Sequence, residues 1–157
     1  MRRAFAVLNR AAPGVAARWA EKLWFTLPKR AVPPPPTGDL FTVDVGGRAV
    51  VGQTWGTGPN VYLVHGWAGH AGQLSAYVAP LVERGHRVIT FDALSHGRSA
   101  PGAYGRRSTS IPELALSFTA VATAYGPAHA VIAHSMGGAA TALAIRDGLT
   151  AGRIATK

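Results

Sequence analysis

Ala133-His134-Ser135-Met136-Gly137-Gly138 is the stretch that decides the fold of this 157-residue chain. A short apolar run, 130–133, leads into it, and a run of mostly small residues, 139–145, follows it. This order predicts a buried strand, a sharp turn with a serine at its apex, and a helix. A sharp turn leaves little room for side chains, and alanine and glycine stand two residues before and after Ser135.

The residue types in this turn suit nucleophilic catalysis. A serine at such an apex exposes its hydroxyl at the carboxyl edge of a sheet, so Ser135 is the candidate nucleophile. The backbone amide of Met136 would open the helix, where unpaired N–H groups and the helix dipole favour an anion, as in an oxyanion hole. His134, Gly137 and Gly138 are expected to shape the turn. Taken alone, however, the pattern also fits an ordinary strand-to-helix turn.

Two further stretches favour the catalytic interpretation of the serine turn over the ordinary one. Val61-Tyr62-Leu63-Val64-His65-Gly66-Trp67 is a second buried-strand pattern, and Val88-Ile89-Thr90-Phe91-Asp92 is a third. With the serine turn, and in this order, they resemble the α/β-hydrolase superfamily in its serine esterase and lipase-like branch. The resemblance covers about residues 40–157. Ala133 and Ser95 depart from it, since glycine is usual at both positions.

The resemblance implies a partial α/β-hydrolase fold, a three-layer α/β/α arrangement with a mostly parallel sheet of about five of the family's eight strands. It implies that the Trp67 backbone amide supplies the second half of the oxyanion hole. The alternative is that Trp67 is a core residue. His65 and Gly66 are expected to fix this loop, and Asp92 to be structural at the end of its strand.

The implied reaction is cleavage of a carboxylic ester through an acyl-enzyme on Ser135, with a small-molecule ester or acyl compound as partner and no metal or cofactor. A histidine and an acid must activate the serine, and in this superfamily both follow it in the chain. No histidine follows Ser135, and the only later carboxylate side chain is that of Asp147. Epoxide and haloalkane hydrolases are disfavoured, because those relatives carry aspartate at the apex.

The chain ends where a sixth strand would begin, at 153–155. We therefore expect an amino-terminal portion of a longer hydrolase, inactive and aggregation-prone alone because the strand at 130–133 becomes a sheet edge. The alternative is a non-catalytic truncated remnant or binding protein that keeps the scaffold. The sequence beyond Lys157 would distinguish them, through a strand–Asp–strand–His pattern or a stop codon.

Composition narrows the class further. The chain has no cysteine, which excludes disulfides and thiol chemistry and fits a reducing, cytoplasmic location. The net charge is +9, but residues 1–30 hold seven basic side chains against one acidic one, which leaves +3 for the remainder. A basic body that binds nucleic acid is therefore not indicated. The oligomeric state stays open.

Three segments are expected: a basic amphipathic helical arm over 1–32, a proline-rich linker over 33–38, and the hydrolase portion over 39–157. The arm should form two short helices broken at Pro13-Gly14. Packing of the arm against its own domain is the favoured interpretation. A weak membrane-surface or partner contact through residues 1–30 is the alternative.

Within the hydrolase portion, alternation and turn residues predict the remaining elements. A hairpin is expected over 41–55, and a helix over 73–84 that Pro80 should kink or split. A capping box formed by Ser110 and Glu113 should open a helix that runs to 125. Residues 96–99 are expected in a loop over the mouth of the pocket.

Overall fold

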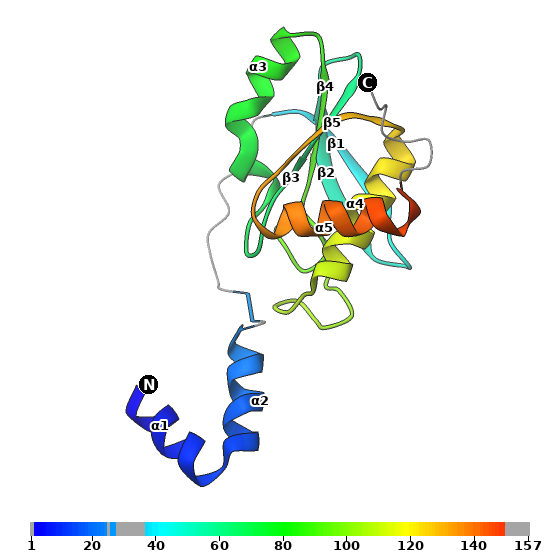
Figure 1. The fold of residues 1–157 in the computed structure, drawn as a ribbon. Coiled ribbons are helices and arrows are strands. Elements are labelled where there is room, and N and C mark those ends of the chain that lie inside the picture. The colour runs from blue at the N-terminus through cyan, green and yellow to red at the C-terminus, as the bar shows by residue number, and fades with distance from the viewer. Residues whose placement is uncertain (1, 25, 28–36, 150–157) are drawn as a thin grey trace.

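The computed structural model describes residues 2–24, 26–27 and 37–149 (Figure 1). Its centre is a five-stranded sheet in the order β1-β2-β4-β3-β5. The strands are β1 (Asp39–Asp44), β2 (Ala49–Trp55), β3 (Asn60–Val64), β4 (Arg87–Phe91) and β5 (Ala128–Ala133). The first two form the expected hairpin, β2 pairs antiparallel with β4, and β3 pairs parallel with both β4 and β5.

Helices cover both faces of the sheet, with α3 on one side and α4 and α5 on the other (Figure 1). The helices are α1 (Arg2–Ala11), α2 (Pro13–Trp24), the 3₁₀ segment η1 (Ala71–Tyr77), α3 (Val78–Glu83), α4 (Ile111–Tyr125), α5 (Met136–Ala144) and the irregular turn η2 (Ile145–Leu149). This is the layered arrangement that the sequence predicts. None of the helices described here is both long and apolar enough to cross a membrane.

The central strands β3 and β4 are mostly apolar because both of their faces are buried. On β3, Tyr62 and Val64 face the core under α4 and α5, while Val61 and Leu63 face the smaller core under η1 and α3. Phe118 of α4 packs its ring edge-on to Tyr62, with the ring centroids 5.7 Å apart. The central strands are thus held from both sides, which gives the loops at their carboxyl ends a rigid base.

The predicted helix over 73–84 is divided, but not at Pro80 itself. A 3₁₀ segment ends at Tyr77, and the α-helix begins at Val78. A proline ring clashes with the carbonyl four residues earlier, so it fits only in the first turn of an α-helix. The division therefore falls two residues before Pro80.

Only half of the predicted capping box forms at the start of α4. The Ser110 hydroxyl accepts a hydrogen bond from the Glu113 amide at 3.4 Å. The buried Glu113 carboxylate does not return to Ser110, since it accepts hydrogen bonds from the Thr109 hydroxyl and the Ala103 amide. Glu113 therefore holds the loop before α4 against the domain.

The amino-terminal arm is a helical hairpin that extends away from the sheet domain (Figure 1). Its attachment lies at its carboxyl end, where the Leu27 amide donates to the Arg107 carbonyl at 2.7 Å and the Arg107 guanidinium donates to the Leu27 carbonyl at 3.0 Å. In the described residues, the hydrogen bonds between the arm and its own domain lie at this junction. Residues 28–36 and 150–157, which hold most of the expected linker and the start of a sixth strand, lie outside the described residues.

Candidate active site

Ser135 stands at a sharp turn between β5 and α5. Its backbone has φ 53° and ψ −121°, a conformation that costs a non-glycine residue roughly 1–3 kcal/mol. The preceding residue still belongs to the sheet ladder, because the His134 amide donates to the Val64 carbonyl at 2.9 Å. The side chain of Ser135 is exposed, and the helix begins at Met136. The predicted strand, turn and helix are all present.

Two glycines bring the loop after β3 against this turn. A Cβ atom on Gly66 would lie 2.8 Å from the His134 carbonyl oxygen and 3.1 Å from the Ser135 Cβ. A Cβ atom on Gly137 would lie 2.5 Å from the His65 carbonyl oxygen. The two backbones can approach this closely only without side chains. As a result, the backbone that leads into Trp67 lies directly beside Ser135.

His65 holds the loop after β3 in place. Its Nε2 accepts a hydrogen bond from the Ala93 amide at 3.0 Å, so the proton must be on Nδ1, which donates to the Gly66 carbonyl at 2.8 Å. The Gly69 amide donates to the same carbonyl at 3.0 Å. Burial, and next the neighbouring His96, lower the pKa of His65 to about 4. The ring is thus neutral and fully engaged, which excludes it as a base for Ser135.

Asp92 binds structural donors around the end of β4. Its carboxylate accepts hydrogen bonds from the Ala71 amide at 2.7 Å and the Arg98 amide at 3.1 Å, and it forms an ion pair with the Arg98 guanidinium at 3.3 Å. Gly97 lies against this carboxylate with φ +46°, and a Cβ there would overlap it. Asp92 therefore ties the start of η1 to the loop after β4.

His96 differs from the sequence-based expectation. It was expected in a loop over the pocket mouth, but it is buried, and its ring centroid lies 4.8 Å from that of His65. Its Nδ1 donates to the Leu94 carbonyl at 2.9 Å, and burial lowers its pKa. Nothing in the spacing of this loop indicates burial, because histidine is common on surfaces and in cores alike.

The structure shows how Ser95 is accommodated at a position where the family usually has glycine. It has φ 66°, the left-handed region in which glycine is favoured. Its hydroxyl donates to the Gly105 carbonyl at 2.7 Å and accepts from the Gly102 amide at 2.9 Å. These two hydrogen bonds offset the backbone strain and fasten the loop after β4 to the loop before α4.

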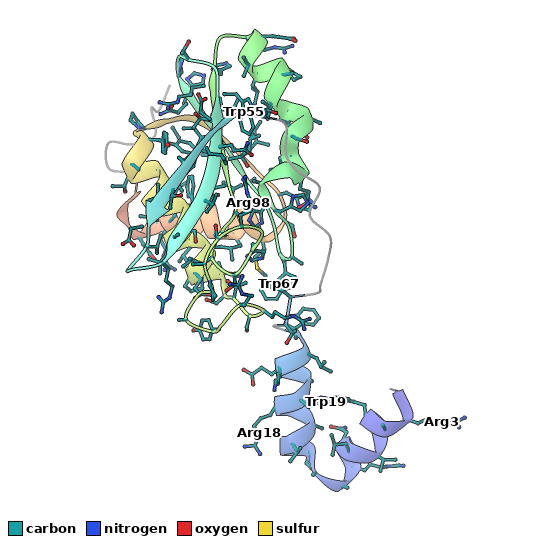
Figure 2. All side chains as sticks on the ribbon, turned by 180° about the vertical axis from the view of Figure 1, so that it is seen from behind. Arg3, Arg18, Trp19, Trp55, Trp67 and Arg98 are labelled. Carbon is teal, nitrogen blue, oxygen red and sulfur yellow. The ribbon has the colours of Figure 1, made fainter. Side chains whose placement is uncertain are left out.

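The remaining polar candidates are not brought to Ser135. Asp147 lies beyond the far end of α5, where its exposed carboxylate pairs with Arg146 at 2.8 Å. The His65 and His96 rings are hydrogen-bonded to backbone groups of the loops after β3 and β4, and no cluster of three metal-ligating side chains occurs among the described residues. A hollow of about 480 Å³ lies between α2 and the loop 104–110, and neither Ser135 nor Trp67 lines it. Figure 2 shows Trp67 at the end of the domain nearest the arm.

The family model described as "Serine aminopeptidase, S33" matches residues 58–154, which is more than half of the chain. The chain belongs to this family. The match contains all three stretches on which the sequence resemblance rests, and it confirms that resemblance to the α/β-hydrolase superfamily. The family and its relatives are enzymes of that superfamily.

Individual proteins are also similar to this chain. The chain is 32% identical over 117 residues to a non-heme haloperoxidase of Rhodococcus erythropolis, covering 73% of this chain and 41% of that protein. Among solved structures it is similar to an esterase from Exiguobacterium antarcticum, with a TM-score of 0.63, 21% identity, and coverage of 75% and 42% of the two chains. It is also similar to an epoxide hydrolase from Vigna radiata, with a TM-score of 0.60, 20% identity, and coverage of 69% and 35%.

These structural likenesses establish the fold, and they confirm the expected partial α/β-hydrolase architecture. The chain spans about two fifths of the length of the curated relative and of the esterase. The S33 chain thus contains the part of the fold that carries the serine turn and the loop after β3.

Proposed function

We propose that this protein is a serine hydrolase that cleaves carboxylic esters. In this proposal the Ser135 hydroxyl attacks the carbonyl carbon, the ester C–O bond breaks, and the alcohol leaves with the proton that a base takes from the serine. Water then hydrolyses the acyl-enzyme, which releases the carboxylic acid and restores Ser135. The backbone amides of Met136 and Trp67 bind the oxyanion of the tetrahedral intermediate. The observation that carries the proposal is the strained turn that exposes Ser135 directly against the loop before Trp67.

The two amides suit this role for different reasons. Met136 is the first residue of α5, so its N–H has no partner within its own helix and lies at the positive end of the helix dipole. Trp67 lies within the loop 65–69, in which the His65 ring and the Gly69 amide both donate to the Gly66 carbonyl. A donor fixed in advance stabilises a developing negative charge without reorganisation during the reaction.

We propose that the catalytic base and acid come from polypeptide beyond these 157 residues. A serine hydroxyl reacts slowly until a base removes its proton, and the buried His65 and exposed Asp147 do not supply this pair. The curated relative is more than twice as long as the matched region, so it has room for both groups. An apex serine also favours acyl transfer over the opening of epoxides.

Labelling with a fluorophosphonate probe tests the nucleophile. In the natural full-length polypeptide, the probe should attach to Ser135, as mapped by mass spectrometry. Ser135→Ala should lower ester turnover by at least about a thousandfold while leaving the fold intact. Ser75→Ala, in η1, is the matched control and should keep both labelling and turnover. Attachment at another serine, or unchanged turnover in Ser135→Ala, would contradict the proposal.

The same probe separates the hydrolase from the scaffold-only alternative. A full-length polypeptide that folds but takes up no probe and turns over no ester would be a non-catalytic remnant or binding protein.

A further inference from the structure

The helical arm has an interior too small to bury its apolar side chains. Phe5 of α1 stacks on Trp19 of α2 with ring centroids 5.6 Å apart, and Ala16 is fully buried between the helices. The two helices have only 10 and 12 residues, a length at which isolated helices are marginal in water. A hairpin of this size needs an additional surface to stabilise it.

A stripe of exposed apolar side chains marks where that surface would lie. On α2, Val15 and Leu23 are 46% and 48% exposed, and they share a face with the partly exposed Trp19 because the three are spaced by four residues. Trp24, at the end of α2, is 77% exposed. Apolar exposure of this extent, concentrated on one helix, is typical of a docking surface.

Basic side chains border the apolar stripe. Arg18 and Lys22 each precede a stripe residue by one position, so they lie along its flank. Both are exposed, and together with Glu21 they border the hollow between α2 and the loop 104–110. Figure 2 shows Arg3 and Arg18 pointing away from the hairpin, while Trp19 lies between the helices. The segment 1–30 carries a net charge of +6, against +3 for the rest of the chain. This concentration of charge selects an anionic partner.

We propose that the arm binds the surface of an anionic lipid bilayer. The apolar stripe would enter the boundary between headgroups and acyl chains, with Arg18 and Lys22 at the lipid phosphates. Exposed tryptophan is favoured at the same depth. A second copy of the chain fits less well, because a symmetric contact through this face would bring equal positive charges together. This inference does not depend on the proposed hydrolase activity.

Vesicle flotation of the whole chain tests the proposal. Phosphatidylcholine vesicles with and without about one third phosphatidylglycerol are floated at low and high salt. Aggregated protein sinks to the pellet and is therefore not counted as bound. The chain should float with the anionic vesicles at low salt. Replacing Arg18→Gln together with Lys22→Gln should lower the partition coefficient about 25-fold, since each basic side chain near an anionic surface contributes about a factor of five.

Two further variants test whether lipid binding depends on the arm surface or only on the overall positive charge of the chain. Arg48→Gln with Arg84→Gln removes the same charge from the sheet domain and should change partitioning about twofold or less. Val15→Ser with Leu23→Ser removes the exposed apolar stripe and should lower partitioning by about tenfold or more. All four positions are exposed, and far-UV circular dichroism checks that the helices persist.

Three results would overturn the proposal. The first is that the chain floats equally well with vesicles of phosphatidylcholine alone. The second is that the Arg48 and Arg84 control loses as much binding as the Arg18 and Lys22 variant. The third is that the arm variants change the oligomeric state in sedimentation without changing lipid binding. The last result would assign the arm to a second copy of the chain.

Discussion

Single residues decide how closely the two loops of the candidate site approach each other. Gly66 and Gly137 each face the backbone of the opposite loop, at distances that no real Cβ atom occupies. For Gly138, next in the chain, the corresponding position has no atom within 4 Å apart from the backbone of its own helix and its chain neighbours. Adjacent glycines of one motif therefore have different physical roles, and only one is required for the contact.

Gly137→Ala should lower the free energy of unfolding by about 1–3 kcal/mol, because the new methyl group meets backbone carbonyls that cannot turn aside. Gly138→Ala should raise it by roughly 0.5–1 kcal/mol, since alanine is favoured over glycine inside a helix. Urea unfolding of the two variants measures the difference. Equal effects would mean that the two loops are not in the described contact.

The buried histidine of the loop after β3 makes stability depend on pH. The pKa of His65 in the folded chain is about 4, below its ordinary value of 6.5, because burial and His96 disfavour the charged ring. The folded state therefore gains stability from the neutral ring, fully present above pH 6.5 and lost as the pH falls towards 4. This loss should be on the order of 2–3 kcal/mol by pH 4.5.

Denaturant unfolding between pH 7.5 and 4.5 measures the slope of the free energy of unfolding against pH. The variant His65→Gln should flatten it, although His96, whose pKa burial also lowers, keeps part of the dependence. Parallel curves for the wild type and His65→Gln would show that the ring is not held neutral by the fold.

At the scale of elements, the sequence predicts most of the framework. The strands β2, β3 and β4 lie within one residue of their expected positions because apolar runs bounded by turn residues have few alternative structures. The partners of Glu113 could not be predicted, since a capping box specifies only local contacts and the carboxylate instead binds Ala103, ten residues earlier. The burial of His96 depends likewise on contacts distant in sequence. The strained turn at Ser135 was predictable because it leaves a local pattern of small residues.

The hydrogen bond from the Glu113 amide to the Ser110 hydroxyl, which caps the start of α4, can be tested by substitution. Ser110→Ala removes the acceptor for the Glu113 amide and should lower the free energy of unfolding by about 1 kcal/mol. Ser110→Asp keeps a good amino-terminal cap and should restore most of this loss. Thermal unfolding monitored by circular dichroism measures both variants. If Ser110→Asp is as unstable as Ser110→Ala, the side-chain cap does not stabilise this helix.

At the scale of the whole molecule, the described sheet has β5 at one edge. Its apolar residues Val131 and Ile132 are only partly buried, and β3 is its only neighbour among the described strands. Exposed apolar edges promote association between chains. We predict that the 157-residue chain alone associates as its concentration rises and shows no ester turnover.

Light scattering over a concentration series, together with an ester assay, measures this outcome. A stable monomer with clear turnover that Ser135→Ala abolishes would contradict it, and would mean that a base and an acid are present within these 157 residues.

The junction at Leu27 and Arg107 places the arm beside the end of the domain at which Trp67 lies (Figure 2). If the arm rests on lipid, the end of the domain that carries Trp67 would face the bilayer rather than bulk water. An amphiphilic ester could then reach Ser135 by lateral diffusion. If the complete protein is the proposed ester hydrolase, its velocity would follow the mole fraction of ester within the lipid phase. Diluting the vesicles in buffer at fixed lipid composition would then leave the turnover of the bound protein unchanged.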